Sequence, residues 1–311
     1  MKRILITGAL GQIGSELTTK LRGLYGNDQV IATDIRKQAE DEMGPFETLD
    51  VSDGNKMYEI AKRYEVDTII HMAALLSATA EAKPVFAWNL NMGGLMNALE
   101  TARELSCQFF TPSSIGAFGP TTPKDNTPQD TIQRPTTMYG VNKVAGELLA
   151  DYYFSRFGVD TRGLRFPGLI SYVTPPGGGT TDYAVEIYYE AVKNGRYTSY
   201  IEEKTYMDMM YMPDALNAIV DLMEADPAKL KHRNSFNVTA MSFSPKEIAK
   251  EIKKSIPTFE ISYNVDPVRQ AIAESWPNSI DASAAKEEWD FEAKFDLEKM
   301  TVDMIEKLSS K

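Results

Sequence analysis

The chain has 311 residues, of which 43% are hydrophobic and 25% charged, and its formal net charge is −11. This composition is typical of a folded globular protein and excludes a largely disordered chain. Because nucleic-acid binding depends on clustered Lys and Arg that neutralise phosphates, an acidic chain without a basic run is not expected to bind nucleic acid.

The only cysteine, Cys107, cannot form an intrachain disulfide, so the sequence favours a reducing, cytoplasmic compartment. No apolar run approaches the length of a membrane-spanning helix, and glycines interrupt the apolar stretch after Lys2 and Arg3. We therefore expect neither a membrane anchor nor a secretory signal. With two histidines, His71 and His232, and no clustered cysteines, we also expect no metal site.

The first element is expected at residues 3–6, where an apolar run without polar alternation predicts a parallel strand buried on both faces. A glycine-rich turn and an amphipathic helix over residues 12–24 follow. In such a unit the backbone approaches a pyrophosphate closely, and the helix N-terminus supplies unpaired N–H groups and positive dipole charge. The residues expected to contact a dinucleotide here are Gly8, Gly11, Gln12, Ile13 and Gly14.

The next apolar run, residues 29–33, ends in Asp34, about twenty residues after the last glycine. An acid in this position accepts hydrogen bonds from the ribose hydroxyls of NAD and repels the additional phosphate of NADP. We therefore expect NAD as the cofactor, with Arg36 stacked near the adenine. The alternative, a glycine-rich turn that serves only helix packing, does not account for the acid.

A further strand is expected over residues 46–50, followed by a helix over residues 55–64. Asp50, together with Val51, is positioned to contact the adenine. Asp50 or Ser52 is equally well interpreted as the N-cap of the following helix, and the two roles are compatible.

Residues 67–71 predict another buried strand, and the small residues 72–77 follow it. Small side chains here allow the chain to pass close beneath a dinucleotide, because ligands bind at the carboxyl ends of parallel strands. The residues expected to contact the cofactor in this segment are Ala73, Ala74 and Leu75.

The later elements of this part alternate as helix, strand, helix and strand, over residues 84–105, 109–112, 139–157 and 160–165. Gly93 and Gly94 within the first helix indicate close packing against a neighbour, since a helical glycine costs up to ~1 kcal/mol relative to alanine. Regular alternation of this kind predicts right-handed crossovers in a Rossmann-type doubly wound parallel sheet, an α/β fold.

After residue 165 prolines and glycines interrupt the pattern. We therefore predict an NAD-binding domain over residues 1–165 and a smaller substrate-binding lobe over residues 166–311. A helix over residues 213–224 and a strand over residues 235–238 are expected to return to the main sheet.

The chemistry is expected at Tyr139 and Lys143, which lie one turn apart on the same helix face. A phenol normally has a pKa near ~10, and a nearby ammonium lowers that pKa, so Tyr139 can act as a base near neutral pH. A hydroxyl from Ser113 or Ser114, at the end of the preceding strand, can orient a substrate alcohol whose hydride goes to nicotinamide. Alone, this spacing more often marks a surface tyrosine beside a solvated lysine; after a nucleotide-binding motif it favours a dehydrogenase.

These residues resemble the extended short-chain dehydrogenase/reductase family. The resemblance rests on residues 7–14, 71–74 and 91–94 together with Asp34, Ser114, Tyr139 and Lys143. It implies a Rossmann fold with a small C-terminal substrate lobe, a homodimer, and a catalytic triad of Ser114, Tyr139 and Lys143. The family's spacing to Phe118 and Gly119 favours Ser114 over Ser113, although a tyrosine is usual at position 118.

Within that family, residues 178–184 and 275–281 are similar to the short-chain L-threonine 3-dehydrogenases. This resemblance implies NAD-dependent oxidation of the L-threonine 3-hydroxyl to L-2-amino-3-oxobutanoate. The implied substrate contacts are Ser77, Ser114, Tyr139, Thr180 and Thr181. Asp182 is either a helix N-cap or a participant in catalysis.

The loop over residues 177–182 is itself suited to a small zwitterion, because glycines let backbone amides converge on a carboxylate while Thr180 and Thr181 add hydroxyl donors. The alternative is a flexible lid without direct contact. Two other functions also remain open. A nucleotide-sugar epimerase would use the same triad, whereas a dehydratase needs acids where this chain has Ile115 and Gly116. A non-enzymatic NAD sensor would not require the triad.

Overall fold

The computed structural model describes residues 1–37, 43–175 and 179–310, and the chain divides into two compact units. Unit 1 comprises Met1–Ser114, Thr137–Arg165 and Ile219–Phe236. Unit 2 comprises Ile115–Thr136, Phe166–Ala218 and Asn237–Lys311. In the described part of the chain, no helix combines the length and the apolar character needed to cross a bilayer.

The main sheet has seven strands in the order β10-β6-β5-β4-β1-β2-β3. They are β1 (Ile4–Thr7), β2 (Val30–Asp34), β3 (Phe46–Thr48), β4 (Thr68–His71), β5 (Gln108–Ser114), β6 (Thr161–Phe166) and β10 (Phe236–Asn237). The pairs β1–β2, β1–β4, β2–β3 and β4–β5 are parallel. This order is that of a doubly wound Rossmann sheet, so the predicted fold class is confirmed.

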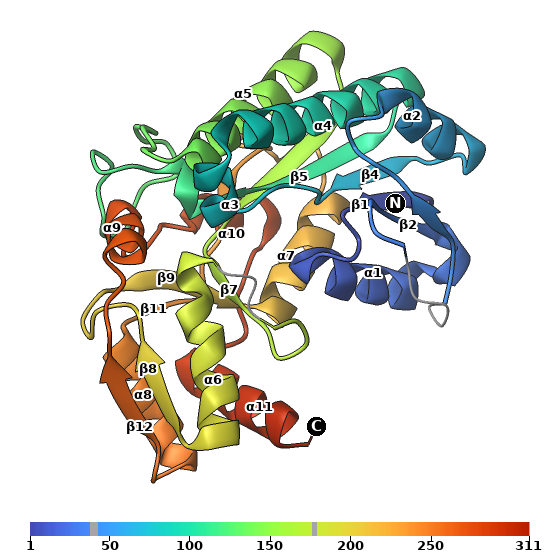
Figure 1. Cartoon of the computed structure of the whole chain (residues 1–311). Coiled ribbons are helices and arrows are strands. Elements are labelled where there is room, and N and C mark those ends of the chain that lie inside the picture. Colours follow the sequence, from blue (N-terminus) through green and yellow to red (C-terminus); the bar gives the residue numbers. More distant parts are fainter. Residues whose placement is uncertain (38–42, 176–178, 311) are drawn as a thin grey trace. The chain divides into compact units, whose positions relative to one another are not determined.

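The helices of unit 1 are α1 (Gln12–Tyr25), α2 (Gly54–Arg63), α3 (Ser77–Ala82), α4 (Pro84–Leu105) and α5 (Met138–Phe157). Helices α2, α4 and α5 cover one face of the sheet, and α1 covers the other (Figure 1). Under α2 and α4, fully buried side chains from the strands, among them Leu5, Ile69 and Phe109, pack with Met57 and Leu99 into one hydrophobic core. Burial of such side chains is the main force that holds helix to sheet.

The predicted boundary after residue 165 can be compared with the two units. Residues 219–236 group with unit 1, and β10, which lies within the segment 235–238, joins the main sheet beside β6. Residues 115–136 group with unit 2, where Thr127 forms a bridge with Ile280. Helix α7 (Met212–Glu224) contributes residues to both units.

Two local predictions in unit 1 need correction. The N-cap of α2 is Asp53, whose side chain accepts a hydrogen bond from the Lys56 amide. Asp50 instead closes a turn, in which its Oδ1 accepts from the Ser52 amide and hydroxyl at 2.9 and 2.8 Å. The turn adds residues before the helix begins, so neither Asp50 nor Ser52 can be the cap.

The two glycines inside α4 differ from each other. A Cβ on Gly94 would lie 2.7 Å from Val51 Cγ2, so this glycine does permit close packing against the segment after β3. A Cβ on Gly93 would meet no atom within 4 Å, so the predicted close approach is wrong for that residue.

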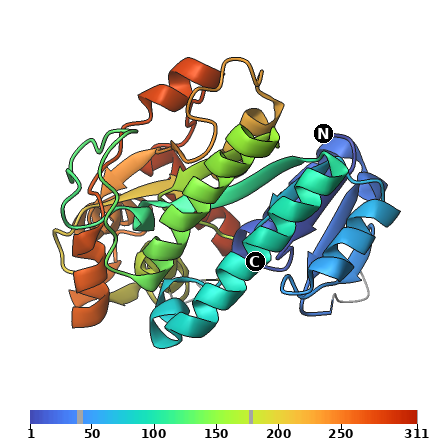
Figure 2. The same cartoon turned by 90° about the horizontal axis from the view of Figure 1, so that it is seen from above.

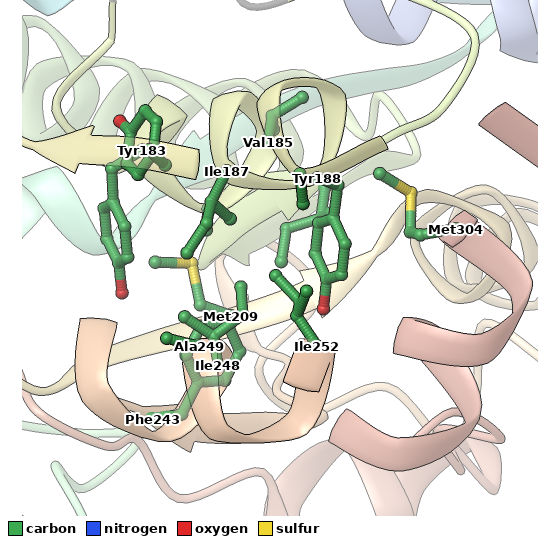
Figure 3. Close-up of a cluster of buried hydrophobic side chains, with 14 of the residues drawn as sticks. Tyr183, Val185, Ile187, Tyr188, Met209, Phe243, Ile248, Ala249, Ile252 and Met304 are labelled. Atoms are coloured by element: carbon green, nitrogen blue, oxygen red, sulfur yellow. The ribbon is translucent and has the colours of Figure 1, made fainter. Parts of the chain in front are cut away.

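Unit 2 contains two small sheets, one in the order β11-β9-β7 and one pairing β12 with β8. The strands are β7 (Gly168–Ile170), β8 (Arg196–Ser199), β9 (Met207–Tyr211), β11 (Met241–Phe243) and β12 (Glu260–Tyr263). The helices are α6 (Tyr183–Asn194), α8 (Pro245–Ser255), α9 (Pro267–Ser275), α10 (Ser283–Trp289) and α11 (Leu297–Ser309). Figure 3 shows Ile187, Tyr188, Met209, Phe243 and Ile252 meeting in the core of this unit.

A buried carboxylate ties three segments of unit 2 together. Asp208, in β9, has no exposed surface; its Oδ1 accepts from the Thr239 hydroxyl and its Oδ2 from the Ile280 amide at 2.8 Å. Burial nevertheless raises the pKa of Asp208 from 3.8 to about 7. The folded state therefore binds this proton more tightly than the unfolded state does.

We expect the contribution of Asp208 to stability to be full below pH 3.8 and to be lost as pH rises towards 7. Asp208→Asn removes the titration, so the free energy of unfolding of the wild type should fall relative to that of the variant by about 2 to 3 kcal/mol between pH 5 and pH 8. Urea unfolding of both proteins at the two pH values measures this difference. A difference independent of pH would contradict the assignment.

Candidate active site

The turn between β1 and α1 depends on two glycines. Gly8 has φ +68°, and a Cβ there would lie 2.8 Å from the backbone N and Cα of Ala73. A Cβ on Gly14 would lie 2.2 Å from the carbonyl oxygen of Gly8. The turn therefore lies directly against the segment after β4, and only glycine fits at these two positions without displacing backbone.

The start of α1 carries donors suited to an anionic ligand. Gly11 is the N-cap and provides no side-chain hydrogen bond, so N–H groups of the first turn lack an intrahelical partner. The side-chain Nε2 of Gln12 is buried and has no hydrogen-bond partner among the described residues. Because buried polar atoms are rarely left unpaired, this donor and the glycine cradle fit a site that holds a polar ligand such as a dinucleotide.

Asp34 ends β2 with 5% of its side chain exposed. Its carboxylate accepts hydrogen bonds from the Leu10 amide at 3.1 Å and from Arg36 Nε and Nη2 at 2.9 and 3.1 Å. Burial opposes ionisation, but the bonds from Arg36 and from backbone amides outweigh it and lower the pKa of Asp34. Arg36 thus forms a bidentate pair with Asp34, an arrangement that the planar guanidinium group favours, and its stacking near the adenine stays a prediction.

A cavity of about 310 Å³ lies at the carboxyl ends of β1, β2 and β4. Nine predicted cofactor residues line it: Gly8, Gly11, Asp34, Arg36, Asp50, Val51, Ala73, Ala74 and Leu75. Four lining residues that the sequence did not indicate are Ile35, Leu49, Met72 and Leu90. Ile35, Leu49 and Met72 adjoin predicted cofactor residues, whereas Leu90 reaches the cavity from α4, beside the segment 91–94, for which no cofactor contact was predicted.

The remaining predicted cofactor residues lie outside this lining. Gln12, Ile13 and Gly14 form the first turn of α1. Tyr139 and Lys143 lie on α5, which begins at Met138 because the Thr137 side chain accepts a hydrogen bond from the Gly140 amide at 3.1 Å.

Lys143 is held between Tyr139 and the end of β5. Its Nζ lies 5.3 Å from the centroid of the Tyr139 ring and donates a hydrogen bond to the Pro112 carbonyl at 2.6 Å. The same spacing recurs on α2, where Lys62 Nζ lies 5.5 Å from the centroid of the Tyr58 ring, but Lys62 is exposed. The two pairs therefore differ not in sequence spacing but in the hydrogen bond from Lys143 to the Pro112 carbonyl near the end of β5.

The two serines at the end of β5 have different surroundings. Ser113 is 7% exposed and donates its hydroxyl hydrogen bond to the buried carboxylate of Glu147. Ser114, the next residue, is half-buried. The Ser113 hydroxyl is therefore engaged with Glu147, and Ser114 stays the predicted hydroxyl for the substrate. Ser77 is buried at the first position of α3.

In unit 2, Thr180 and Thr181 lie in a single turn, Thr180–Asp182, that leads into α6. Thr180 is 4% exposed, and Thr181 packs so closely on β7 that a Cβ on Gly168 would lie 2.8 Å from its Cγ2. Asp182 stands at the N-cap position of α6, yet its carboxylate accepts from the Gly179 amide at 2.7 Å and makes no capping bond to α6. The other two glycines of the predicted loop, at positions 177 and 178, lie outside the described residues.

Comparison with known proteins agrees with this arrangement. Residues 4–239 match the model of the NAD dependent epimerase/dehydratase family. An epimerase/dehydratase of Staphylococcus haemolyticus, described as uncharacterized, is 64% identical over 314 residues, which cover 100% of this chain and 99% of that protein.

Solved structures are similar over their whole length. The X-ray structure of L-threonine dehydrogenase from Clostridium difficile is 70% identical with a TM-score of 0.98, covering 100% of this chain and 98% of that one. A monomeric L-threonine 3-dehydrogenase from a metagenome database is 44% identical with a TM-score of 0.95, covering 99% of each chain. With the family model matching most of its length, the chain belongs to the NAD-dependent epimerase/dehydratase family, a group of extended short-chain dehydrogenases/reductases, and its cofactor is NAD.

Proposed function

We propose that this protein is an L-threonine 3-dehydrogenase that oxidises the 3-hydroxyl of L-threonine to give L-2-amino-3-oxobutanoate. The observation that carries the proposal is the anchored Lys143, 5.3 Å from the Tyr139 ring and bonded to the strand end that presents Ser114. Similarity to dehydrogenases of that name, at up to 70% identity over the whole chain, supports the choice of substrate.

Each residue has a distinct task in this reaction. NAD, when bound, accepts the hydride from the carbon that bears the hydroxyl. Tyr139 Oη removes the hydroxyl proton, and the Lys143 ammonium supplies a positive charge beside the tyrosine ring. The Ser114 hydroxyl orients the substrate oxygen. Gln12, the first-turn amides of α1 and the Asp34 carboxylate would hold the pyrophosphate and the adenosine ribose.

We also propose that Thr180 and Thr181 recognise the zwitterionic end of threonine, while Asp182 holds their turn through Gly179. Thr180→Val and Thr181→Val keep the side-chain shape and remove the hydroxyl. If a hydroxyl donates to bound threonine, its loss should cost about 1 to 3 kcal/mol, which lowers kcat/KM for threonine by about 5- to 150-fold. Steady-state kinetics with threonine and titration with NAD measure the two effects separately.

NAD affinity should stay unchanged in both variants. Thr198→Val provides a matched control, because Thr198 is an exposed residue of the same unit whose hydroxyl forms a hydrogen bond with the Ser262 hydroxyl at 2.9 Å. If both test variants had the same threonine kinetics as the wild type, the proposal that Thr180 and Thr181 contact the substrate would be wrong.

We further propose a homodimer formed through α4 and α5, which lie side by side in unit 1 (Figure 2). Both helices expose large apolar side chains: Val85, Trp88 and Met96 on α4, and Val141, Leu148 and Tyr152 on α5. Exposed apolar surface of this extent marks an interaction site more often than an ordinary monomer surface. A two-fold axis would bring the same helices of two copies together.

The oligomeric state can be measured by sedimentation. The wild type should sediment at twice the 34.7 kDa of one chain, and Leu148→Arg, at a position 64% exposed, should sediment as a monomer. Leu24→Arg is the control, because Leu24 is 56% exposed on α1, on the other face of the sheet. If the wild type sedimented as a monomer, the proposal of a homodimer would be wrong. The metagenomic relative is named as a monomeric enzyme.

A further inference from the structure

Unit 1 contains a buried ion pair for which the proposed chemistry has no use. Glu147 on α5 and Arg165 on β6 are 5% and 8% exposed. Arg165 Nη2 and Nε donate to the two carboxylate oxygens of Glu147 at 2.9 and 3.0 Å. Burying two charges costs solvation, and apolar residues of the same shape often give equal or greater stability. Stability alone is therefore a poor explanation for this pair.

The pair connects directly to the predicted catalytic residues. Glu147 also accepts the hydrogen bond of the Ser113 hydroxyl. Lys143, one turn earlier on the same face of α5, donates to the carbonyl of Pro112, the residue before Ser113. Two consecutive turns of α5 are thus bonded to two consecutive residues of β5, and Arg165 holds Glu147 from the neighbouring strand.

Packing does not hold Lys143 in place by itself. A cavity of about 50 Å³ is lined by Lys143, Glu147 and Ser113, together with polar side chains such as Asn91 and Asn142. This volume exceeds what one water molecule needs. A lysine beside such a space has room for other rotamers, so hydrogen bonds must define its position.

We propose that Ser113, Glu147 and Arg165 form a positioning network that fixes the end of β5 against α5 and thereby holds the Lys143 ammonium beside Tyr139. The proposed chemistry assigns none of these three residues a contact with substrate or cofactor. Ser113 is the link between the ion pair and the strand. Its loss frees the Pro112 carbonyl to move and lets the ammonium leave the tyrosine. The kinetic consequence rests on the proposed function, whereas the position of Lys143 does not.

Ser113→Ala breaks the link and leaves the ion pair intact. With threonine as substrate, kcat should fall about tenfold, the scale of one lost buried hydrogen bond. The acid limb of the kcat–pH profile should move to higher pH, because the cation beside the general base is less well placed. Ser113→Thr, which keeps a hydroxyl, should restore both kcat and the profile.

Thr101→Val is the matched structural control. Thr101 on α4 is 3% exposed, and its hydroxyl donates to the Asn97 carbonyl at 2.8 Å. The substitution also removes a buried hydroxyl from unit 1, but it should leave the pH profile unmoved. If Ser113→Ala kept the wild-type profile, or if Thr101→Val changed the profile equally, the positioning role would be overturned.

A second readout does not depend on the reaction. Acetic anhydride acetylates Lys143 of the NAD-free protein, and peptide mass spectrometry follows the rate at that residue. We expect a several-fold faster rate in Ser113→Ala and a wild-type rate in Ser113→Thr and Thr101→Val. An equal rate in Ser113→Ala would overturn the network. If the rate changed as expected but the wild type did not oxidise threonine, the proposed function would fail while the network remained.

Discussion

Tyr139→Phe is expected to lower kcat for L-threonine by at least about 100-fold, the usual scale for loss of a general base. The substitution removes the ionisable oxygen and keeps the ring that lies 5.3 Å from Lys143 Nζ. Contacts to the adenosine half of NAD should persist, since that cavity is lined by other residues. Steady-state kinetics and calorimetric titration with NAD measure the two properties independently.

Tyr58→Phe is a matched control for this substitution. On α2, Tyr58 and Lys62 have the same sequence spacing as Tyr139 and Lys143, and Lys62 Nζ lies at a similar distance, 5.5 Å, from the centroid of the tyrosine ring. We expect wild-type kinetics from this variant. Near-normal turnover by Tyr139→Phe would require the proposed chemistry to be abandoned.

Gly14→Ala should weaken NAD binding by at least about tenfold and lower the unfolding temperature. The added Cβ would lie 2.2 Å from the Gly8 carbonyl oxygen, a backbone atom that cannot rotate away. Relieving such an overlap costs about 1 to 3 kcal/mol and displaces the turn that receives the pyrophosphate. Titration calorimetry and thermal unfolding of the NAD-free protein measure both effects.

Gly23→Ala, in the same helix, makes the identical chemical change where a Cβ would meet no atom within 4 Å. There we expect unchanged NAD affinity and a gain in stability of up to about 1 kcal/mol, since alanine has the higher helix propensity. Equal NAD affinity in both variants would show that the geometry of the turn does not control binding.

Much of unit 1 could be predicted because its signals are local. The strand, turn and helix over β1 and α1 are encoded by an uninterrupted apolar run and by glycine spacing, and the structure confirms these elements. Strands β4 and β6 are also short, fully buried runs between helices. Each such segment specifies its own conformation before it meets its neighbours.

The strands of unit 2 were harder to recognise. Strand β9 reads Met-Asp-Met-Met-Tyr, with every residue buried, and it lacks the β-branched residues typical of strands. Its conformation depends on pairing with β7 and β11, which lie far from it in the sequence.

The limits at the site are similarly physical. The sequence indicated Asp34 and Arg36, but not that they pair, because an ion pair depends on side-chain rotamers. Glu147 carries no motif of its own, and its importance follows from contacts with Ser113 and Arg165, which tertiary structure brings to it. Residues whose roles depend on one turn of backbone could be predicted, whereas those that depend on distant partners could not.

Hydride transfer from L-threonine to NAD, the proposed activity, can be measured directly. The protein is mixed with NAD and, in separate samples, with L-threonine, with UDP-galactose or with no substrate, and the absorbance of reduced nicotinamide is followed. We expect absorbance to rise with L-threonine alone, at a rate proportional to enzyme concentration. Conversion of UDP-galactose without a rise in absorbance in the threonine sample would contradict the proposed activity and favour a sugar-nucleotide epimerase. If neither compound reacted, the protein would bind NAD but would not be a threonine dehydrogenase.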